Sequence, residues 1–466
     1  MNDRKSAGET ADTSVDVSDI TIADPRRLKK TVAGTAIGNF TEWYDFGVYS
    51  YIVPIISAVF FPTSSLAEVA SFAGLAVSFL VRPLGGIFWG ILGDRIGRKG
   101  VLAITVLMMA GGTFGLGVLP GYAAIGVAAP VLLFAARAVQ GFSTGGEYVG
   151  AMTFLTEHAP DRQRGHICSF LPVGTLGGYI FGALFVIVLQ EVLTHDEMVS
   201  WGWRLPFLVA APLGLAGMYL RLRLEETPAY EDQEEERLRR RDAITQGMET
   251  VRQYWRPMLV CGGLVLSFNV TNYMLTGYLP TYLSKRLDLE SNSALIIVVI
   301  VMAIVASIVT FLGLLSDKVG RKPVMWAGAI MLVVFSVPVF MLILRGGYLA
   351  VFFGTLPMGL MLACFMSTEP GTLPTFFPTD VRYGATSISF NISVSLFGGT
   401  TPLIAAWLVH RTGDLMMPAY MLVVAGIVGV VSVWFTPEPV AQPLPGSTPT
   451  AASKEEAREI ASSSSA

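Results

Sequence analysis

Apolar stretches of about 20 residues follow one another along almost the whole chain, and this is the length that an α-helix needs to cross a hydrocarbon core about 30 Å thick. A strand of an outer-membrane barrel would need only about 10 alternating residues. Hydrophobic residues make up 52% of the 466 residues and charged residues only 14%, against about a quarter in soluble domains. The sequence therefore predicts an all-α membrane protein with twelve transmembrane helices. They are expected near residues 31–61, 69–92, 101–119, 125–156, 166–191, 205–222, 258–282, 293–315, 323–344, 347–376, 384–410 and 417–436.

The positive charges predict the orientation, because Lys and Arg near helix ends are retained on the cytoplasmic side. Clusters of Lys and Arg follow the even-numbered helices, whereas loops 62–68 and 120–124 hold none. Both termini are therefore expected to be cytoplasmic, in a multi-pass protein of the plasma membrane. The expected organisation is a cytoplasmic tail (1–30), a six-helix bundle (31–222), a charged cytoplasmic central loop (223–257), a second six-helix bundle (258–436) and a disordered cytoplasmic tail (437–466).

One short motif occurs twice, once after the second expected helix and once after the eighth. Positions 90–99 read GILGDRIGRK, and positions 313–322 read GLLSDKVGRK. A repeat in equivalent places predicts two six-helix halves related by duplication. Two such halves, with a site between them near the bilayer midplane, are what an alternating-access transporter requires.

The repeated motif is also a candidate conformational latch. The basic residues of the motif would be enough to fix the topology, but they do not explain its aspartates and glycines. These suit a contact in which the aspartate is held at a helix N-terminus or by an Arg of a neighbouring loop. Such a contact could break and reform between two states. A pure topology signal remains the alternative. The latch candidates are Gly90, Asp94, Arg95, Gly97, Arg98, Asp317, Lys318 and Arg321.

The repeated motif resembles the signature of the major facilitator superfamily, and other segments resemble its metabolite:proton symporter family. These segments are 38–46 (GNFTEWYDF), 137–147 (RAVQGFSTGGE) and 201–207 (WGWRLPF). Segments 269–284 (NVTNYMLTGYLPTYLS), 390–393 (FNIS) and 415–420 (LMMPAY) resemble the proline/glycine-betaine proton symporter branch. The resemblance implies the major facilitator fold and proton-coupled uptake of a zwitterionic compatible solute by alternating access. Osmosensing members of that branch extend their C-terminus into a coiled coil, whereas residues 437–466 hold no heptads that could form one. The resemblance therefore supports solute uptake more firmly than osmotic activation.

Carboxylates inside the expected helices are candidates for proton coupling, because ionisable groups in a membrane are costly and are usually kept for function. Glu42 and Asp45 are three residues apart and share one helical face. Together with Glu147 they are the coupling candidates, and the structural alternative is that these carboxylates and Arg82 lock the N-terminal bundle together as buried ion pairs. Arg137 and Glu147 are too far apart to pair on one helix, so each is expected to pair across helices. Glu369 is expected to reach solvent near a helix end and is given no role.

A zwitterion with a quaternary ammonium needs a donor for its carboxylate and aromatic faces for its cation. Asn272 and Tyr273 follow Asn269 by three and four residues, and this spacing predicts a polar-aromatic stripe on an otherwise apolar helix. For any single aromatic residue, ordinary packing or contact with lipid is the alternative. The substrate-binding candidates are Arg137, Trp43, Tyr44, Tyr148, Asn269, Tyr273 and Asn391, with Asn272, Tyr278 and Phe390 as further cavity residues.

Other functions find less support in the sequence. There is no nucleotide-binding loop for a primary pump, and four scattered His and three separated Cys give an enzyme no metal cluster. No cofactor is expected, since the proton gradient drives transport. Nucleic-acid binding has no basic domain to support it, and a monomer is expected. A proton symporter for an organic anion such as a dicarboxylate or shikimate, and a membrane sensor, remain alternatives.

Overall fold

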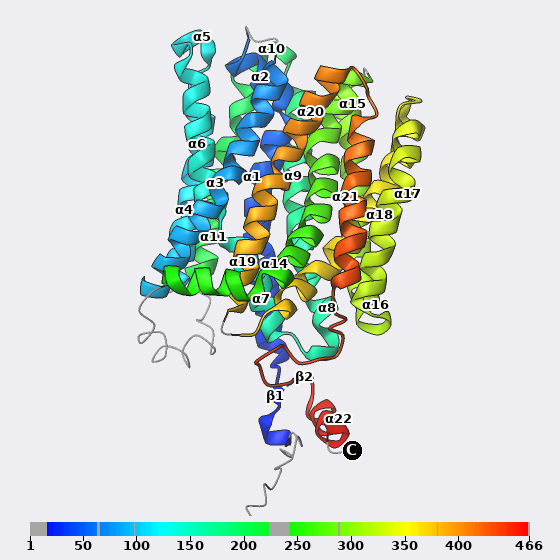
Figure 1. Ribbon diagram of the computed structural model, residues 1–466. Coiled ribbons are helices and arrows are strands. Elements are labelled where there is room, and N and C mark those ends of the chain that lie inside the picture. Colours follow the sequence, from blue (N-terminus) through cyan, green and yellow to red (C-terminus); the bar gives the residue numbers. More distant parts are fainter. Residues whose placement is uncertain are drawn as a thin grey trace, which may run out of the picture.

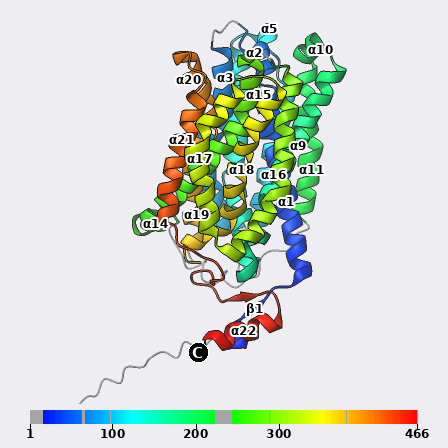
Figure 2. The same cartoon turned by 90° about the vertical axis from the view of Figure 1, so that its right-hand side faces the viewer.

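The computed structural model describes residues 16–62, 66–96, 98–222, 243–287, 289–379 and 381–464; the side chains of 90–103, 220–222, 243–248 and a few single positions lie outside this description. Long helices run side by side in one bundle, and β1 near the N-terminus and α22 near the C-terminus lie at the same end of it (Figures 1 and 2). We call this the terminal end and the opposite one the far end.

The N-terminal half contains the helices up to residue 222, several of which are broken within one membrane span. Their bounds are α1 Pro25–Tyr51, α2 Val53–Phe60, α3 Ala67–Ile96, α4 Arg98–Val118, α5 Tyr122–Ile125, α6 Ala128–Thr144, α7 Glu147–His158, α8 Arg164–Cys168, α9 Phe170–Val192, α10 His195–Ser200 and α11 Leu205–Leu222, with short 3-10 turns η1 Val17–Asp19, η2 Asp161–Gln163 and η3 Gly202–Arg204.

The C-terminal half repeats this arrangement. Its elements are α14 Ala243–Tyr273, the π-helix η4 Met274–Tyr278, α15 Leu279–Arg286, α16 Ser291–Val319, α17 Arg321–Ile343, α18 Tyr348–Thr372, the 3-10 turn η5 Leu373–Phe376, α19 Arg382–Ser393, the π-helix η6 Val394–Gly398, α20 Thr400–Thr412 and α21 Met417–Phe435. Strands β1 Thr21–Ile22 and β2 Thr450–Ala451 and helix α22 Lys454–Ser464 complete the chain.

Within the described residues, eight helical segments are long and apolar enough to span a membrane, or nine if the bent pair α1 and α2 forms one span. Two shorter apolar helices, 104–118 and 202–216, add to these, and α6 followed by α7 supplies the remaining one. The helices of the described parts thus match the twelve expected spans, and the predicted fold class is confirmed.

Glycines bring neighbouring helices of the N-terminal half into backbone contact. A Cβ on Gly141 of α6 would collide with the carbonyl of Ser78 on α3, and one on Gly85 of α3 would collide with the carbonyl of Phe142. Small residues of this kind are what allows close helix packing in a membrane. The contact fixes α3, which carries Arg82, against α6, which carries Arg137.

The structure describes the C-terminal tail as far as residue 464 and places it against the bundle, where the sequence predicts a disordered segment 437–466. β2 pairs in parallel with β1, and Ala451 and Ala457 pack on Ile20. The tail also crosses the terminal end of both halves: Arg382 donates to the carbonyl of Pro445 at 2.7 Å and Arg164 to that of Gln442 at 3.0 Å. The tail is thus held by arginines at the starts of α8 and α19 and by a small apolar contact with Ile20. Composition did not reveal this, because these partners lie far away in the sequence.

The expected central loop 223–257 contains the first turns of a helix. Residues 223–242 lie outside the description, but α14 already begins at Ala243. Its first turns cross the terminal end of the bundle (Figure 1), and the helix bends at Tyr254, which has φ −108° and ψ 17°. Pro257 lies three residues further on; it has no N–H to donate to the carbonyl of Gln253, and its ring clashes with that carbonyl, which breaks the helix at this point. The charged run therefore leads into a helix that precedes the membrane span.

Candidate functional site

Two carboxylates of α1 are held by arginines from neighbouring helices. Glu42 Oε1 accepts from Arg82 Nη2 of α3 at 2.7 Å, and Asp45 Oδ2 lies 3.5 Å from Arg137 Nη1 of α6. Gln140 donates to the same Asp45 oxygen at 3.0 Å. All five side chains are at most 3% exposed. The expected pairing of Arg137 across helices is thus what the structure shows, and its partner is Asp45.

The three predicted coupling carboxylates line one small cavity. Glu42, Asp45 and Glu147 all contribute to a cavity of about 20 Å³ between α1, α4, α7 and α11. A cavity above about 10–15 Å³ can hold one water molecule if polar partners are present. The arrangement therefore has room for a water between carboxylates that come from two separate motifs of the sequence.

An aromatic cluster lies where the two halves meet. The ring of Trp43 is 6.3 Å from that of Tyr148, 5.6 Å from Tyr179 and 6.1 Å from Tyr273. Phe390 of α19 stacks on Tyr148 at 5.2 Å. Trp43, Tyr148 and Tyr179 belong to the N-terminal half, and Tyr273 and Phe390 to the C-terminal half. The cluster therefore joins side chains of both halves in the interior of the bundle.

Arg82 is the arginine that faces this cluster. Its guanidinium carbon lies 5.8 Å from the ring centre of Trp43 and 4.6 Å from that of Phe79. The Nε of Arg82 is buried and has no acceptor among the described residues. Arg137, which the sequence analysis placed in the substrate site, lies instead over the ring of Tyr49 at 4.2 Å. Helix spacing could not distinguish the two, since both arginines lie in apolar stretches.

The other predicted substrate residues are divided between the cluster and its surroundings. Tyr44 points away, donating to the carbonyl of Pro206 at 2.8 Å. Asn269 donates to the carbonyl of Val265 on its own helix. Asn391 joins the halves by donating to the carbonyl of Gly145 at 2.5 Å.

Several buried polar groups near the cluster lack partners. Both amide atoms of Asn272 and the hydroxyl of Tyr273 are buried and make no hydrogen bond within the described part of the chain. Asn272 lies beside the hydroxyl of Tyr179, although without hydrogen-bond geometry. Unpaired buried polar groups are costly, and the π-helix η4, which begins directly after Tyr273, is a feature frequent at functional sites. Together these groups mark a place where a polar ligand would complete the hydrogen bonding.

Glu369 of α18 is buried, contrary to the expectation that it reaches solvent. It is 3% exposed, and its carboxylate has no hydrogen bond or ion pair among the described residues. It lies close enough to Tyr148 and Cys261 for its charge to act on both. The signal that could have found it is an acidic residue within an apolar block, which the position near a helix end obscured.

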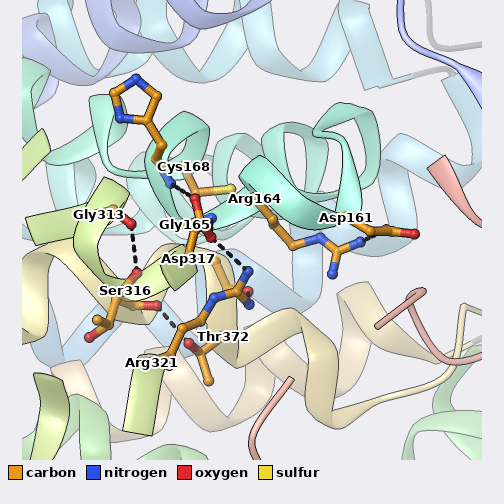
Figure 3. A network of polar contacts seen from close by, with 12 residues as sticks. Asp161, Arg164, Gly165, Cys168, Gly313, Ser316, Asp317, Arg321 and Thr372 are labelled. Carbon is orange, nitrogen blue, oxygen red and sulfur yellow. Dashed lines mark hydrogen bonds and ion pairs between the residues drawn. The ribbon is translucent and has the colours of Figure 1, made fainter. Parts of the chain in front are cut away.

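The repeated motif of the C-terminal half contacts the N-terminal half at the terminal end. Asp317, at the end of α16, accepts hydrogen bonds at 2.8 Å from the backbone N–H groups of both Gly165 and His166 at the start of α8 (Figure 3). Arg321 lies 3.7 Å from Asp317 and donates to the carbonyl of Gly371 at 2.6 Å. Lys318 is exposed and lies outside this network.

The first copy of the motif cannot be compared with the second. The side chains of the candidates Gly90, Asp94, Arg95, Gly97 and Arg98 lie outside the described residues. Among the residues that are described, no group of three His, Cys, Asp or Glu could hold a metal ion. The chemistry available to the site therefore comes from its aromatic, amide, arginine and carboxylate groups.

A family model described as sugar (and other) transporter matches residues 31–448. The solved structure of the proton:xylose symporter XylE is similar to this fold, with a TM-score of 0.72 and 19% sequence identity. The alignment covers 93% of this chain and 99% of the XylE chain. The fold and the match define a transporter of the major facilitator superfamily, and the chain belongs to the sugar (and other) transporter family. It is thus a multi-pass membrane protein that moves a small solute, and not an enzyme.

Curated relatives are similar over nearly the whole chain. A proline/betaine transporter of Salmonella typhimurium is 42% identical over 96% of this chain and 91% of its own length. A glycine betaine/proline/ectoine/pipecolic acid transporter, OusA, of Dickeya dadantii is 43% identical over 95% and 90%. A putative proline/betaine transporter of Staphylococcus aureus is 44% identical over 89% and 90%.

Proposed function

We propose that this transporter takes up a zwitterionic compatible solute, proline or glycine betaine, together with protons, across the plasma membrane. The observation that carries the proposal is the aromatic cluster between the halves, which combines ring faces, a buried arginine and unpaired polar groups. The names of the relatives point to the same solutes. We place both termini in the cytoplasm, as the positive charges predict, and treat the protein as a monomer.

The two charges of the solute have matching partners at the cluster. The rings of Trp43, Tyr148 and Tyr273 offer faces for a quaternary or secondary ammonium, and the Nε of Arg82 offers a donor for a carboxylate. We assign the carboxylate to Arg82 rather than to Arg137, because Arg82 lies against the ring of Trp43, whereas Arg137 lies over the ring of Tyr49, outside the cluster. Asn272 and the Tyr273 hydroxyl supply further hydrogen bonds. Asn269 and Asn391 line the surroundings and shape the site indirectly.

Protons are carried in this proposal by the carboxylates around the small cavity. Asp45 and Glu147 are the principal coupling groups, and Glu42 connects them to the solute site through its ion pair with Arg82. A water in the cavity would let a proton pass between them. Because Arg82 contacts both Glu42 and the aromatic cluster, a change in the charge of Glu42 would alter the field at the bound solute.

Alternating access would open and close the contact between Asp317 and the start of α8. In this structure the contact is closed, with a carboxylate accepting from two backbone N–H groups at a helix N-terminus, a favourable place for a negative charge. Arg321 holds the carboxylate from its own half. Opening the terminal end towards the cytoplasm requires both hydrogen bonds to break.

The proposal is tested by uptake of labelled proline, glycine betaine and a dicarboxylate into proteoliposomes, with and without an imposed pH gradient. We expect proline and glycine betaine to accumulate only when the gradient is present. Accumulation of the dicarboxylate instead would favour the organic-anion alternative. Equal uptake of the zwitterions with and without the gradient would overturn proton coupling.

A further inference from the structure

A second, larger cavity lies between the halves at the far end of the bundle, away from the aromatic cluster. Its volume is about 410 Å³, and its walls come from α1, α2, α9 and α10 of one half and α15 and α16 of the other. The labels of α2, α10 and α15 all stand at the far end in Figure 1. We call this space the outer cavity. With the termini in the cytoplasm it faces the outside, so a solute would meet it before the aromatic cluster.

Two side-chain carbonyls in the wall of the outer cavity lack a donor. Asn292 is 8% exposed and uses its amide nitrogen to donate to Glu191 Oε1 at 2.7 Å. This bond fixes the orientation of the amide, because a carboxylate only accepts, and leaves Asn292 Oδ1 buried without a partner in the described residues. Gln190 Oε1 is likewise buried and unpaired there. Both residues line the cavity. Its wall therefore holds two carbonyl oxygens that no donor of the described residues satisfies.

The charges around the outer cavity favour a cation. Glu290 lines it, with one oxygen accepting from Ser293 at 3.3 Å. The basic residues of the nearby α15, Lys285 and Arg286, form ion pairs with Glu68 of α3 at 3.7 and 3.6 Å. Hydrogen bonds from Thr194 lower the pKa of the Glu197 carboxyl on α10, the helix whose His195 and Met198 line the cavity.

We infer that the outer cavity is a second solute site, selective for zwitterions whose ammonium carries N–H groups. The secondary ammonium of proline has two N–H groups, which match the two unpaired carbonyls Asn292 Oδ1 and Gln190 Oε1, and the Glu290 carboxylate in the same wall favours its positive charge. A quaternary ammonium has no N–H group and leaves both carbonyls unpaired, which a polar site strongly disfavours. The imidazole of His195 and the hydroxyl of Thr281, which also line the cavity, are available to the carboxylate of the solute.

This inference rests on the proposed function and refines it, because it separates the two solutes by chemistry. Proline, a secondary amine, fits both the outer cavity and the aromatic cluster. Glycine betaine, with three methyl groups on nitrogen, fits only the aromatic cluster. The expected ratio of sites per protein is therefore two for proline and one for glycine betaine.

Equilibrium binding of labelled proline and glycine betaine to the full chain in lipid nanodiscs tests this ratio. In Asn292→Leu and, separately, Gln190→Leu, we expect the outer site to bind proline about tenfold more weakly, the effect of losing one hydrogen bond to a charged group. Glycine betaine binding should stay unchanged in both and shows that the variants are folded. Gln253→Leu, which changes an exposed amide on α14, is the matched control and should keep two proline sites.

The outcomes separate this inference from the proposed function. One proline site in the unmodified chain, or two sites for glycine betaine, would overturn the outer site and leave the proposed function standing. Two proline sites that survive both leucine substitutions unchanged would overturn it as well. Binding of neither solute would overturn both.

Discussion

In the interior of the bundle, the carboxylates of α1 in the N-terminal half and that of α18 in the C-terminal half are buried in opposite ways. In the N-terminal half, Glu42 and Asp45 each face an arginine from a neighbouring helix. In the C-terminal half, Glu369 is equally buried and has no cation partner among the described residues. Removing one member of a buried pair leaves the other charge uncompensated, whereas replacing a lone carboxyl by an amide of the same shape removes a group that was costly to bury. The halves should therefore respond differently to the same kind of substitution.

The largest effect is expected in the N-terminal half. Asp45→Asn leaves the Arg137 guanidinium buried without its carboxylate and should lower the free energy of unfolding by about 3–5 kcal/mol. Thermal unfolding of the purified protein measures this. The double substitution Asp45→Asn with Arg137→Met removes both charges and should recover most of the loss. A double variant as unstable as the single one would show that the pair is not what stabilises this region.

A smaller effect is expected where the halves meet at the terminal end. Asp317→Asn weakens two hydrogen bonds to the start of α8, worth about 1.5–3 kcal/mol for a charged acceptor. The state open at this end should become more populated, and the buried Cys168 of α8 should react at least about tenfold faster with a maleimide. The experiment uses a chain in which Cys261 and Cys364 are replaced by Ala.

Lys318→Gln is the matched control for this change, because Lys318 is exposed on the same motif and outside the network. It should leave the labelling rate of Cys168 unchanged. If Asp317→Asn also leaves the rate unchanged, the motif only fixes topology.

A substitution in the aromatic cluster should have a still smaller effect, and it should change the affinity for the solute rather than the stability of the protein. Tyr148→Leu removes one ring face from the ammonium, and cation–π contacts of about 0.5–2 kcal/mol predict a KM for glycine betaine raised about twofold to thirtyfold. Tyr44→Phe, which changes a tyrosine that points away from the cluster, should leave the KM unchanged. Equal effects of both substitutions would place the solute elsewhere.

The smallest effect is expected at Glu369. Glu369→Gln keeps the shape of the side chain and breaks no ion pair, so the unfolding temperature should stay the same or rise slightly. Thermal unfolding beside the Asp45→Asn variant gives the comparison directly. A loss as large as that of Asp45→Asn would show that Glu369 has a charged partner and that the halves do not differ.

Much of the fold could be predicted from the sequence, because the apolar blocks and the repeated motif are local patterns. The site was predicted less evenly. Trp43, Tyr148 and Tyr273 do lie together, but the arginine beside them is Arg82 and not the predicted Arg137. Helical spacing shows which residues share a face, not which neighbouring helix that face meets. The tail and the outer cavity depend on contacts between segments far apart in the chain, for which one sequence holds no signal.

Proton movement during uptake tests the central claim most directly. Proteoliposomes that hold a pH-sensitive dye, with no gradient imposed, should acidify inside when glycine betaine is added outside. Glu147→Gln, which removes a coupling carboxylate without breaking either N-terminal ion pair, should abolish the acidification while solute exchange continues. Uptake of glycine betaine by the unmodified protein without any change in internal pH would contradict the proposal.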